Sequence, residues 1–303
     1  MKRSDLQSAL AGRRLCCDGA MGTQLLARGL TSGECGMLWN IEKPDAVRAV
    51  HEAYRQAGCD LITTNSFGGS AYALERHGLG DRVAELNRAA AQIARAAAGE
   101  CGWVLGDVGP FGDFLEPLGD TTAGELREAF RAQIEALLAG GADAILVETM
   151  SDPAEAVVGI EAAKSCDAKV PVVVTYAFQK TGPGEFRTMM GTGIEAALQS
   201  AVGAGAEIVG ANCGTSLSLE DYVELAKQIA SAAGGAHVII QPNAGAPRME
   251  GDQTVYDATP EQMAATTSEL IAAGVNIAGG CCGTTPGHIA AVARSVKAAG
   301  RHA

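Results

Sequence analysis

Short apolar runs alternate with longer amphipathic stretches along the whole chain. The runs are rich in Val, Ile and Leu, and several contain no polar alternation, which is typical of parallel strands buried on both faces. They predict eight strands, at residues 14–18, 60–65, 103–108, 144–148, 172–176, 207–212, 238–243 and 275–279.

Helical patterns fill the intervals between these runs. Residues 44–57 and 125–138 repeat their apolar positions at the 3.6-residue period of an amphipathic helix. Two helix starts combine an N-cap, a proline at the first helical position and a capping-box partner. These are Asp152-Pro153 with Glu155, and Thr259-Pro260 with Gln262.

Eight strand–helix units in about 300 residues predict a single (β/α)8 TIM barrel, an α/β fold, as one domain over residues 1–303. The alternative is a doubly wound open sheet, which usually has fewer strands and a Gly-x-Gly-x-x-Gly turn after the first one. Residues 18–23 lack the third glycine of that turn. Long connections at 31–43 and 110–122 are expected to overhang the C-terminal face of the strands, where barrel active sites lie.

Charge and composition narrow the range of partners. The formal net charge is −12 and no block of like charges occurs, which argues against nucleic acid and anionic membranes as partners. No apolar run reaches 18 residues, and the N-terminus lacks the apolar region of a secretory signal. We therefore expect a cytoplasmic protein whose nine cysteines do not form a disulfide framework and can include metal-binding or catalytic thiols.

Three cysteines stand where two predicted strands end. Cys213 lies in Ala-Asn-Cys-Gly (211–214), and Cys281 and Cys282 lie in Gly-Gly-Cys-Cys-Gly-Thr (279–284). A catalytic zinc site has three protein ligands and an open fourth position, which a thiol substrate could occupy. The alternatives are a redox pair and inert packing, and packing is the interpretation we adopt for the other six cysteines.

Further polar residues follow the predicted strands. Glu148 ends an apolar strand while Asp152 caps the next helix, so Glu148 is free to bind an ammonium group. Asp18 precedes Gly19, where turn chemistry alone is a sufficient explanation. The segment 19–23 enters a helix whose N–H groups favour an anion such as a carboxylate. A phosphate cradle at 279–285 is disfavoured because nothing basic stands near it, and no histidine is placed to act as a ligand or base.

Several segments together resemble one known family. They are Asp-Gly-Ala-Met-Gly-Thr (18–23), Thr-Asn-Ser-Phe-Gly (64–68), Gly-Asp-Val-Gly-Pro (106–110), Glu-Thr (148–149), Asn-Cys (212–213), Pro-Asn-Ala-Gly (242–245) and Gly-Gly-Cys-Cys-Gly-Thr-Thr-Pro (279–286). The chain looks like a homocysteine S-methyltransferase over residues 15–294. It is most similar to the homocysteine-binding domain of cobalamin-dependent methionine synthase.

The resemblance implies a zinc site and a bound amino-acid thiol. Zinc would be held by Cys213, Cys281 and Cys282. Glu148 would bind the homocysteine ammonium, and backbone at Gly22 and Thr23, with Asp18 nearby, would hold the amino-acid end. Asn243 matches a polar residue that touches the metal when substrate is absent. No catalytic residue beyond the zinc site is implied.

The resemblance also bears on the methyl donor. The expected donor is a methylcorrinoid, either methylcobalamin or a corrinoid on a separate protein. The chain ends at Ala303, so the folate, corrinoid and activation domains of methionine synthase are expected to be missing. Betaine-using relatives carry a tyrosine where Thr149 stands, which disfavours betaine. S-methylmethionine as donor, and methyl transfer to or from another small thiol, remain alternatives. A zinc-dependent barrel hydrolase is the candidate of a different class, although such sites usually contain histidine.

Elementary thiol chemistry supplies the expected mechanism. A free thiol has a pKa of about 8.5, only the thiolate attacks carbon well, and zinc deprotonates a coordinated thiol. Three cysteine thiolates give the zinc site a charge of −1, and a fourth from homocysteine would make it −2. The excess charge keeps electron density on the sulfur, so the methyl-transfer step needs no general base.

Overall fold

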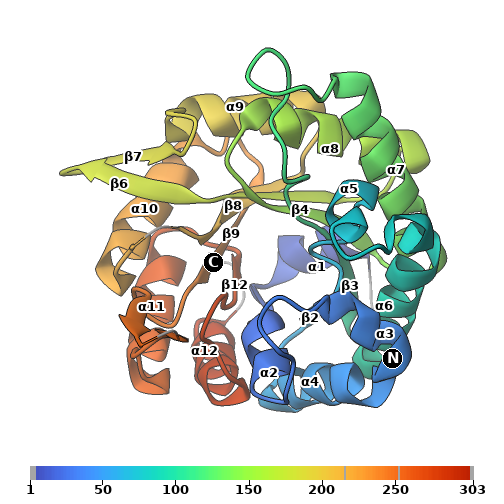
Figure 1. The fold of residues 1–303 in the computed structure, drawn as a ribbon. Coiled ribbons are helices and arrows are strands. Elements are labelled where there is room, and N and C mark those ends of the chain that lie inside the picture. The colour runs from blue at the N-terminus through green and yellow to red at the C-terminus, as the bar shows by residue number, and fades with distance from the viewer. Residues whose placement is uncertain (1–4, 215, 252, 301–303) are drawn as a thin grey trace.

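A ring of eight parallel strands surrounded by helices forms the protein in our computed structural model, which describes residues 5–214, 216–251 and 253–300 (Figure 1). The strands are β1 (Leu15–Cys16), β2 (Leu61–Thr63), β3 (Trp103–Val108), β4 (Ala144–Met150), β5 (Val172–Tyr176), β8 (Ile208–Cys213), β9 (His237–Pro242) and β12 (Ile277–Ala278). Their order is β1-β12-β9-β8-β5-β4-β3-β2, and a bridge between Cys17 and Leu61 joins β2 back to β1. The predicted TIM barrel is confirmed.

One long helix follows each barrel strand and covers its outer face. These helices are α4 (Pro44–Ala57), α6 (Val83–Ala98), α7 (Ala123–Ala139), α8 (Pro153–Cys166), α9 (Ile194–Ala204), α10 (Leu219–Ala232), α11 (Pro260–Ala272) and α12 (Pro286–Ala298). Shorter helices occupy the connections: α2 (Gly22–Leu26), η1 (Gly36–Leu38), α3 (Trp39–Glu42), α5 (Ala71–Glu75) and η2 (Gly80–Arg82). The segment 31–43 therefore contains two of these short helices.

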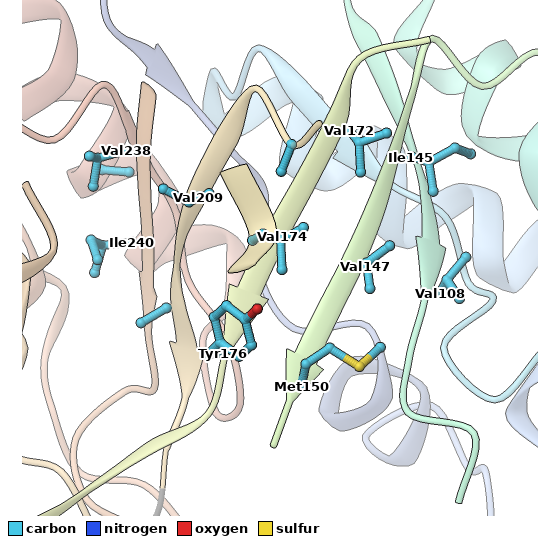
Figure 2. Close-up of a cluster of buried hydrophobic side chains, with 14 of the residues drawn as sticks. Val108, Ile145, Val147, Met150, Val172, Val174, Tyr176, Val209, Val238 and Ile240 are labelled. Atoms are coloured by element: carbon cyan, nitrogen blue, oxygen red, sulfur yellow. The ribbon is translucent and has the colours of Figure 1, made fainter. Parts of the chain in front are cut away.

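The strand residues alternate between two buried layers. Side chains that point outward pack against the helices, and Figure 2 shows Val147, Val174 and Val209 projecting from neighbouring strands in this outer layer. The intervening residues, such as Leu146 and Val173, form a separate inner cluster that fills the barrel. Helix α1 (Leu6–Gly12) runs directly into β1 and adds Leu6 and Leu10 to the inner cluster, which covers the barrel at the N-terminal ends of the strands.

Two hairpins in the connections were not predicted. One pairs β6 (Phe178–Gly182) with β7 (Glu185–Thr188) after β5, and it extends away from the barrel in Figure 1. The other pairs β10 (Arg248–Glu250) with β11 (Gln253–Val255) after β9. Both contain short strands rich in polar residues, so neither produces the continuous apolar run by which the barrel strands are recognised.

The two predicted capping boxes have different outcomes. Thr259 and Gln262 form the reciprocal pair, as expected. Asp152 caps α8 by accepting from Ala154 N–H, but Glu155 does not complete a box. Its Oε1 accepts from Phe111 N–H at 2.6 Å instead, because the long β3–α7 connection carries a buried N–H that needs a partner.

In the part of the chain described above, no helix combines the length and apolarity that crossing a bilayer requires.

Candidate metal centre and substrate pocket

Three thiols converge at the C-terminal ends of β8 and β12. The Sγ atoms of Cys213, Cys281 and Cys282, which we call the mouth cluster, all lie within 4.8 Å of one another. Cys282 Sγ is 4.0 Å from each of the other two. A tetrahedral zinc ion with Zn–S bonds of about 2.3 Å places its sulfurs about 3.8 Å apart. The donor set and the spacing therefore fit zinc, and the pocket in front leaves room for a fourth ligand.

The backbone is bent to bring these thiols together. Cys213 adopts the left-handed conformation at φ +54°, which is uncommon outside glycine, and so turns the chain sharply at the end of β8. The Cys281–Cys282 segment is anchored to β9 by hydrogen bonds from Cys281 N–H to Pro242 O and from Ala244 N–H to Cys282 O. Both anchors are short, at 2.8 and 2.9 Å, so two adjacent thiols are presented from one fixed turn.

Glycine is required at the next position for two reasons. Gly283 has φ +78°, and a Cβ there would lie 2.3 Å from the ring of Tyr256. Tyr256 follows the β10–β11 hairpin, and its hydroxyl hydrogen-bonds Cys282. The unpredicted hairpin thus places an aromatic ring against the turn that carries two of the three thiols.

The thiols hold negative charge unequally. Hydrogen bonds from Cys213 and Cys281 hold the pKa of Cys282 at about 3, so this sulfur is a thiolate at neutral pH. Sharing hydrogens with Cys213 and Cys282 raises the pKa of Cys281 well above its usual range. One negative charge is stable in the cluster without a cation, whereas ionisation of all three thiols requires a cation among them.

The polar residues that end the neighbouring strands point into the same space. Along β3, β4 and β8 every second side chain faces the barrel interior, beginning with Trp103, Ala144 and Ile208. Continuing this alternation to the strand ends places Asp107, Glu148 and Asn212 on the inward-facing side as well. Inward-facing residues thus change from apolar in the barrel to polar at its mouth.

Two carboxyl groups lie together in this layer. Burial raises the pKa of Glu148 to about 7, and a hydrogen bond from Asp107 opposes that rise. Burial and the Glu148 charge raise the pKa of Asp107 well above its usual range. The pKa of Asp107 is thus raised further than that of Glu148, so Asp107 holds its proton more tightly and Glu148 is the first of the two to ionise.

Asn212 joins the carboxyl pair to the thiols. Its Nδ2 donates to Glu148 Oε2 at 3.0 Å and lies 3.7 Å from Cys281 Sγ. Neither Asn212 nor Asp107 was assigned a role from the sequence. They can be identified from the sequence because they are polar residues at inward-facing positions of strands whose other inward-facing residues are apolar.

A pocket of about 290 Å³ opens in front of these groups, near the lower end of the range for small-molecule sites. Its lining includes the mouth cluster, Asp18, Asp107, Glu148, Gly22 and Thr23. None of its lining residues, all within the described part of the chain, is Lys, Arg or His. A bound ligand must therefore supply positive charge to Glu148 or leave that carboxylate without a counter-ion.

Asp18, Gly22 and Thr23 come from the β1–α4 connection. The Asp18 carboxylate is buried and accepts from Thr63 N–H and Thr63 Oγ1–H, both at 2.8 Å, while burial raises its pKa to about 7. Gly22 begins α2, and a Cβ on Gly22 would meet nothing within 4 Å. The buried Thr23 Oγ1 has no hydrogen-bond partner among the described residues, so it is free for a ligand.

Asn243 lies beside the metal-binding position but not on the pocket wall. Its Nδ2 donates to Cys213 O at 3.4 Å, and its buried Oδ1 has no partner among the described residues. This buried oxygen is available to a ligand, and its contact with a metal stays a prediction.

Comparisons with known proteins point to one enzyme family. The family model "Homocysteine S-methyltransferase" matches residues 15–296. Methionine synthase of Mycobacterium tuberculosis (strain ATCC 25618 / H37Rv) is 34% identical over 312 residues, covering 97% of this chain and 25% of that protein. Methionine synthase of Mycobacterium leprae (strain TN) matches with the same identity and coverage. The chain thus spans about a quarter of the length of these curated relatives.

Solved structures agree on the fold. The metallated form of the homocysteine methyltransferase MmuM from Escherichia coli superposes with a TM-score of 0.74 at 24% identity, covering 93% of this chain and 96% of that one. A methyltransferase from Methanosarcina mazei gives a TM-score of 0.60 at 12% identity, with 97% of each chain covered.

Proposed function

The chain belongs to the homocysteine S-methyltransferase family, and from this premise we propose that it is a zinc-dependent enzyme that methylates the thiol of homocysteine to give methionine. The observation that carries the proposal is the meeting of three thiols with one partly buried glutamate in a single pocket that has no cationic lining residue among those described. A small thiol that carries an ammonium group suits both ends of that pocket.

Cys213, Cys281 and Cys282 would hold the zinc ion. When bound there, zinc lowers the pKa of a substrate thiol so that it is ionised at neutral pH. The three anionic ligands leave net negative charge around the site, which maintains the nucleophilicity of that sulfur. The other residues then have only to bind and orient, since a thiolate needs no base to attack a methyl group.

Glu148 would bind the substrate ammonium. Its carboxylate accepts from Asn212 Nδ2 at 3.0 Å, and the neighbouring Asp107 has a pKa raised well above its usual range, so Glu148 ionises first. The substrate carboxylate would lie at the β1–α4 connection, against backbone near Gly22 and Thr23 and the unpartnered Thr23 Oγ1. Asp18 would support this end by fixing the connection to β2 through Thr63.

The surface around the pocket favours a large methyl donor such as a methylcorrinoid, free or on a separate protein. Among the described residues, the exposed large hydrophobic side chains all lie on segments between a barrel strand and its following helix. They are Leu26, Ile41, Phe67, Tyr72, Phe114, Leu118, Met189 and Met249. Such apolar surface around a polar pocket is typical of a face that meets a partner. The alternative donor is S-methylmethionine, a small molecule that would leave this surface uncovered.

Incubation of the zinc-loaded protein with homocysteine and either methylcobalamin or S-methylmethionine tests the proposal. Methionine formed from methylcobalamin supports the proposed donor, whereas turnover with S-methylmethionine alone would replace it. The same assay with other small thiols as acceptors tests homocysteine as the substrate. Hydrolysis of esters or amides without any methyl transfer would place the chain in the class of zinc hydrolases instead.

A further inference from the structure

Asn212 contacts both halves of the proposed substrate site through one side chain. It is the next-to-last residue of β8 and is 1% exposed. Its Nδ2 lies 3.0 Å from Glu148 Oε2, which would bind the ammonium, and 3.7 Å from Sγ of the metal-binding Cys281. A single nitrogen therefore lies between the amine-binding group and a metal ligand.

The same amide is held in place from the other side. Its Oδ1 accepts from Thr175 Oγ1–H at 2.8 Å and from Thr149 N–H at 3.0 Å, and Nδ2 also donates to Thr149 Oγ1 at 2.7 Å. Oδ1 thus has two donors, and the two N–H groups of Nδ2 go to Glu148 Oε2 and Thr149 Oγ1, so the Cys281 sulfur at 3.7 Å is a close contact and not a third hydrogen bond. Its orientation is fixed by contacts to two neighbouring strands, so it cannot adjust to a ligand without breaking several hydrogen bonds.

These contacts also stabilise a strained turn beside Glu148. Thr149 is a β-branched residue at φ +60°, where the β4–β5 register shifts between Val147 and Met150. Such a conformation costs about 1–3 kcal/mol and persists only where the surroundings enforce it. The two hydrogen bonds between Thr149 and Asn212 supply that enforcement, and so Asn212 determines where the Glu148 carboxylate lies.

We propose that Asn212 is a positioning residue that fixes the separation between Glu148 and the metal-binding thiols, and that this separation selects homocysteine over cysteine. The inference rests on the proposed function. Cysteine is one methylene shorter between its nitrogen and its sulfur. Because Asn212 keeps this separation fixed, cysteine can place its amine at Glu148 or its thiol at the metal, but not both. Homocysteine engages both, and only the longer substrate benefits from the fixed spacing.

Isothermal titration of homocysteine and cysteine into the zinc-loaded protein tests the proposal. Wild type is compared with two variants. Asn212→Ser removes the carboxamide that separates Glu148 from the thiols. Asn212→Asp keeps the shape of the side chain but places a carboxyl group beside Glu148. Zinc content and melting temperature are measured for each variant. Asn87→Ser is the matched control, because Asn87 is a fully buried amide that donates to Gly69 O and Val83 O outside the pocket.

We expect both Asn212 variants to retain zinc and to lose about tenfold or more in homocysteine affinity, in the range typical for residues that orient metal-site groups. Cysteine affinity should change much less, so the homocysteine-to-cysteine ratio falls, while Asn87→Ser keeps the wild-type ratio. An unchanged ratio in both Asn212 variants would overturn the inference. Loss of zinc from both would also overturn it, because Asn212 would then support the thiols alone. Failure of zinc-loaded wild type to bind homocysteine would instead refute the proposed function itself.

Discussion

Two groups of three cysteines lie in this barrel, and only one of them forms a metal-binding geometry. Cys16, Cys17 and Cys59, which we call the strand-1 group, surround β1 and the start of β2 and are 0–1% exposed. The mouth cluster lies at the ends of β8 and β12 and is only partly buried. Among the described residues, a set of convergent metal-ligand atoms is found at the mouth cluster and not at the strand-1 group.

The two groups differ in what their neighbours offer. Cys16 donates its thiol hydrogen to Cys17 O, and Cys17 donates to Asp18 Oδ1. Burial raises the pKa values of Cys17 and Cys59 well above the usual range, with the Asp18 charge acting in the same direction. These thiols stay protonated and pack as small apolar groups. At the mouth, by contrast, sulfur faces sulfur and one thiolate is already stable.

The most severe way to break this contrast is to remove one sulfur from each group. Cys282→Ala should abolish stoichiometric zinc binding and lower methyl transfer by at least about 100-fold, because two thiolates do not replace a three-ligand site. Cys59→Ala should retain zinc and activity and lose only about 1 kcal/mol of stability through lost packing. Metal analysis and a turnover assay on both variants make the comparison. Full turnover in Cys282→Ala would contradict the metal mechanism.

A second comparison uses two glutamates, Glu155, which is buried, and Glu148, which is partly buried. Glu148 and Glu155 both have pKa values raised to about 7 by burial, but only Glu148 lines the pocket. Glu148→Gln should raise the Michaelis constant for homocysteine about 10- to 100-fold with zinc still bound, since a charge-assisted hydrogen bond is worth about 1.5–3 kcal/mol. Glu155→Gln should leave that constant unchanged. An equal effect of the two substitutions would remove Glu148 from the ammonium site.

The last expected effect is on stability instead of activity and concerns Glu155 alone. The folded protein keeps the Glu155 proton up to about pH 7, whereas the unfolded chain loses it near the usual glutamate pKa of 4.5. The folded state therefore binds more protons between these values, and the stability conferred by this group is lost as pH rises through 7. Glutamine mimics the protonated form and still accepts from Phe111 N–H.

Glu155→Gln should thus be nearly neutral at pH 5 and stabilising at pH 8, by up to about 3 kcal/mol. Chemical denaturation of wild type and variant at both pH values measures the difference. If the gain in the free energy of unfolding from Glu155→Gln became smaller as pH rises, this would contradict the assignment of a buried, protonated Glu155.

Much of the architecture follows from periodicity. The predicted runs at 103–108 and 172–176 coincide with β3 and β5, and the predicted helix at 44–57 coincides with α4. These segments are apolar on the side that is buried, so pattern and structure agree. The meeting of Cys213 with the Cys281–Cys282 pair was also predictable. Each of these segments lies at the end of a strand, and parallel strands of a barrel end at one face.

Other features depend on tertiary contacts that no local pattern expresses. Thr149 and Cys213 adopt left-handed conformations that their own side chains disfavour. Asn212, which accepts a hydrogen bond from Thr149 N–H, is 63 residues away in the sequence. The ring of Tyr256, which follows the β10–β11 hairpin, packs against Gly283 in the turn after Cys282. Asp107 and Asn212 were within reach of sequence reasoning, since strict alternation places both on the inward face.

Zinc-edge X-ray absorption of the purified protein, with and without homocysteine, tests the central claim most directly. We predict one zinc per chain with three sulfur neighbours at about 2.3 Å, rising to four when homocysteine is added. A protein that carries no stoichiometric zinc, or a sulfur count that stays the same when homocysteine binds, would contradict the account.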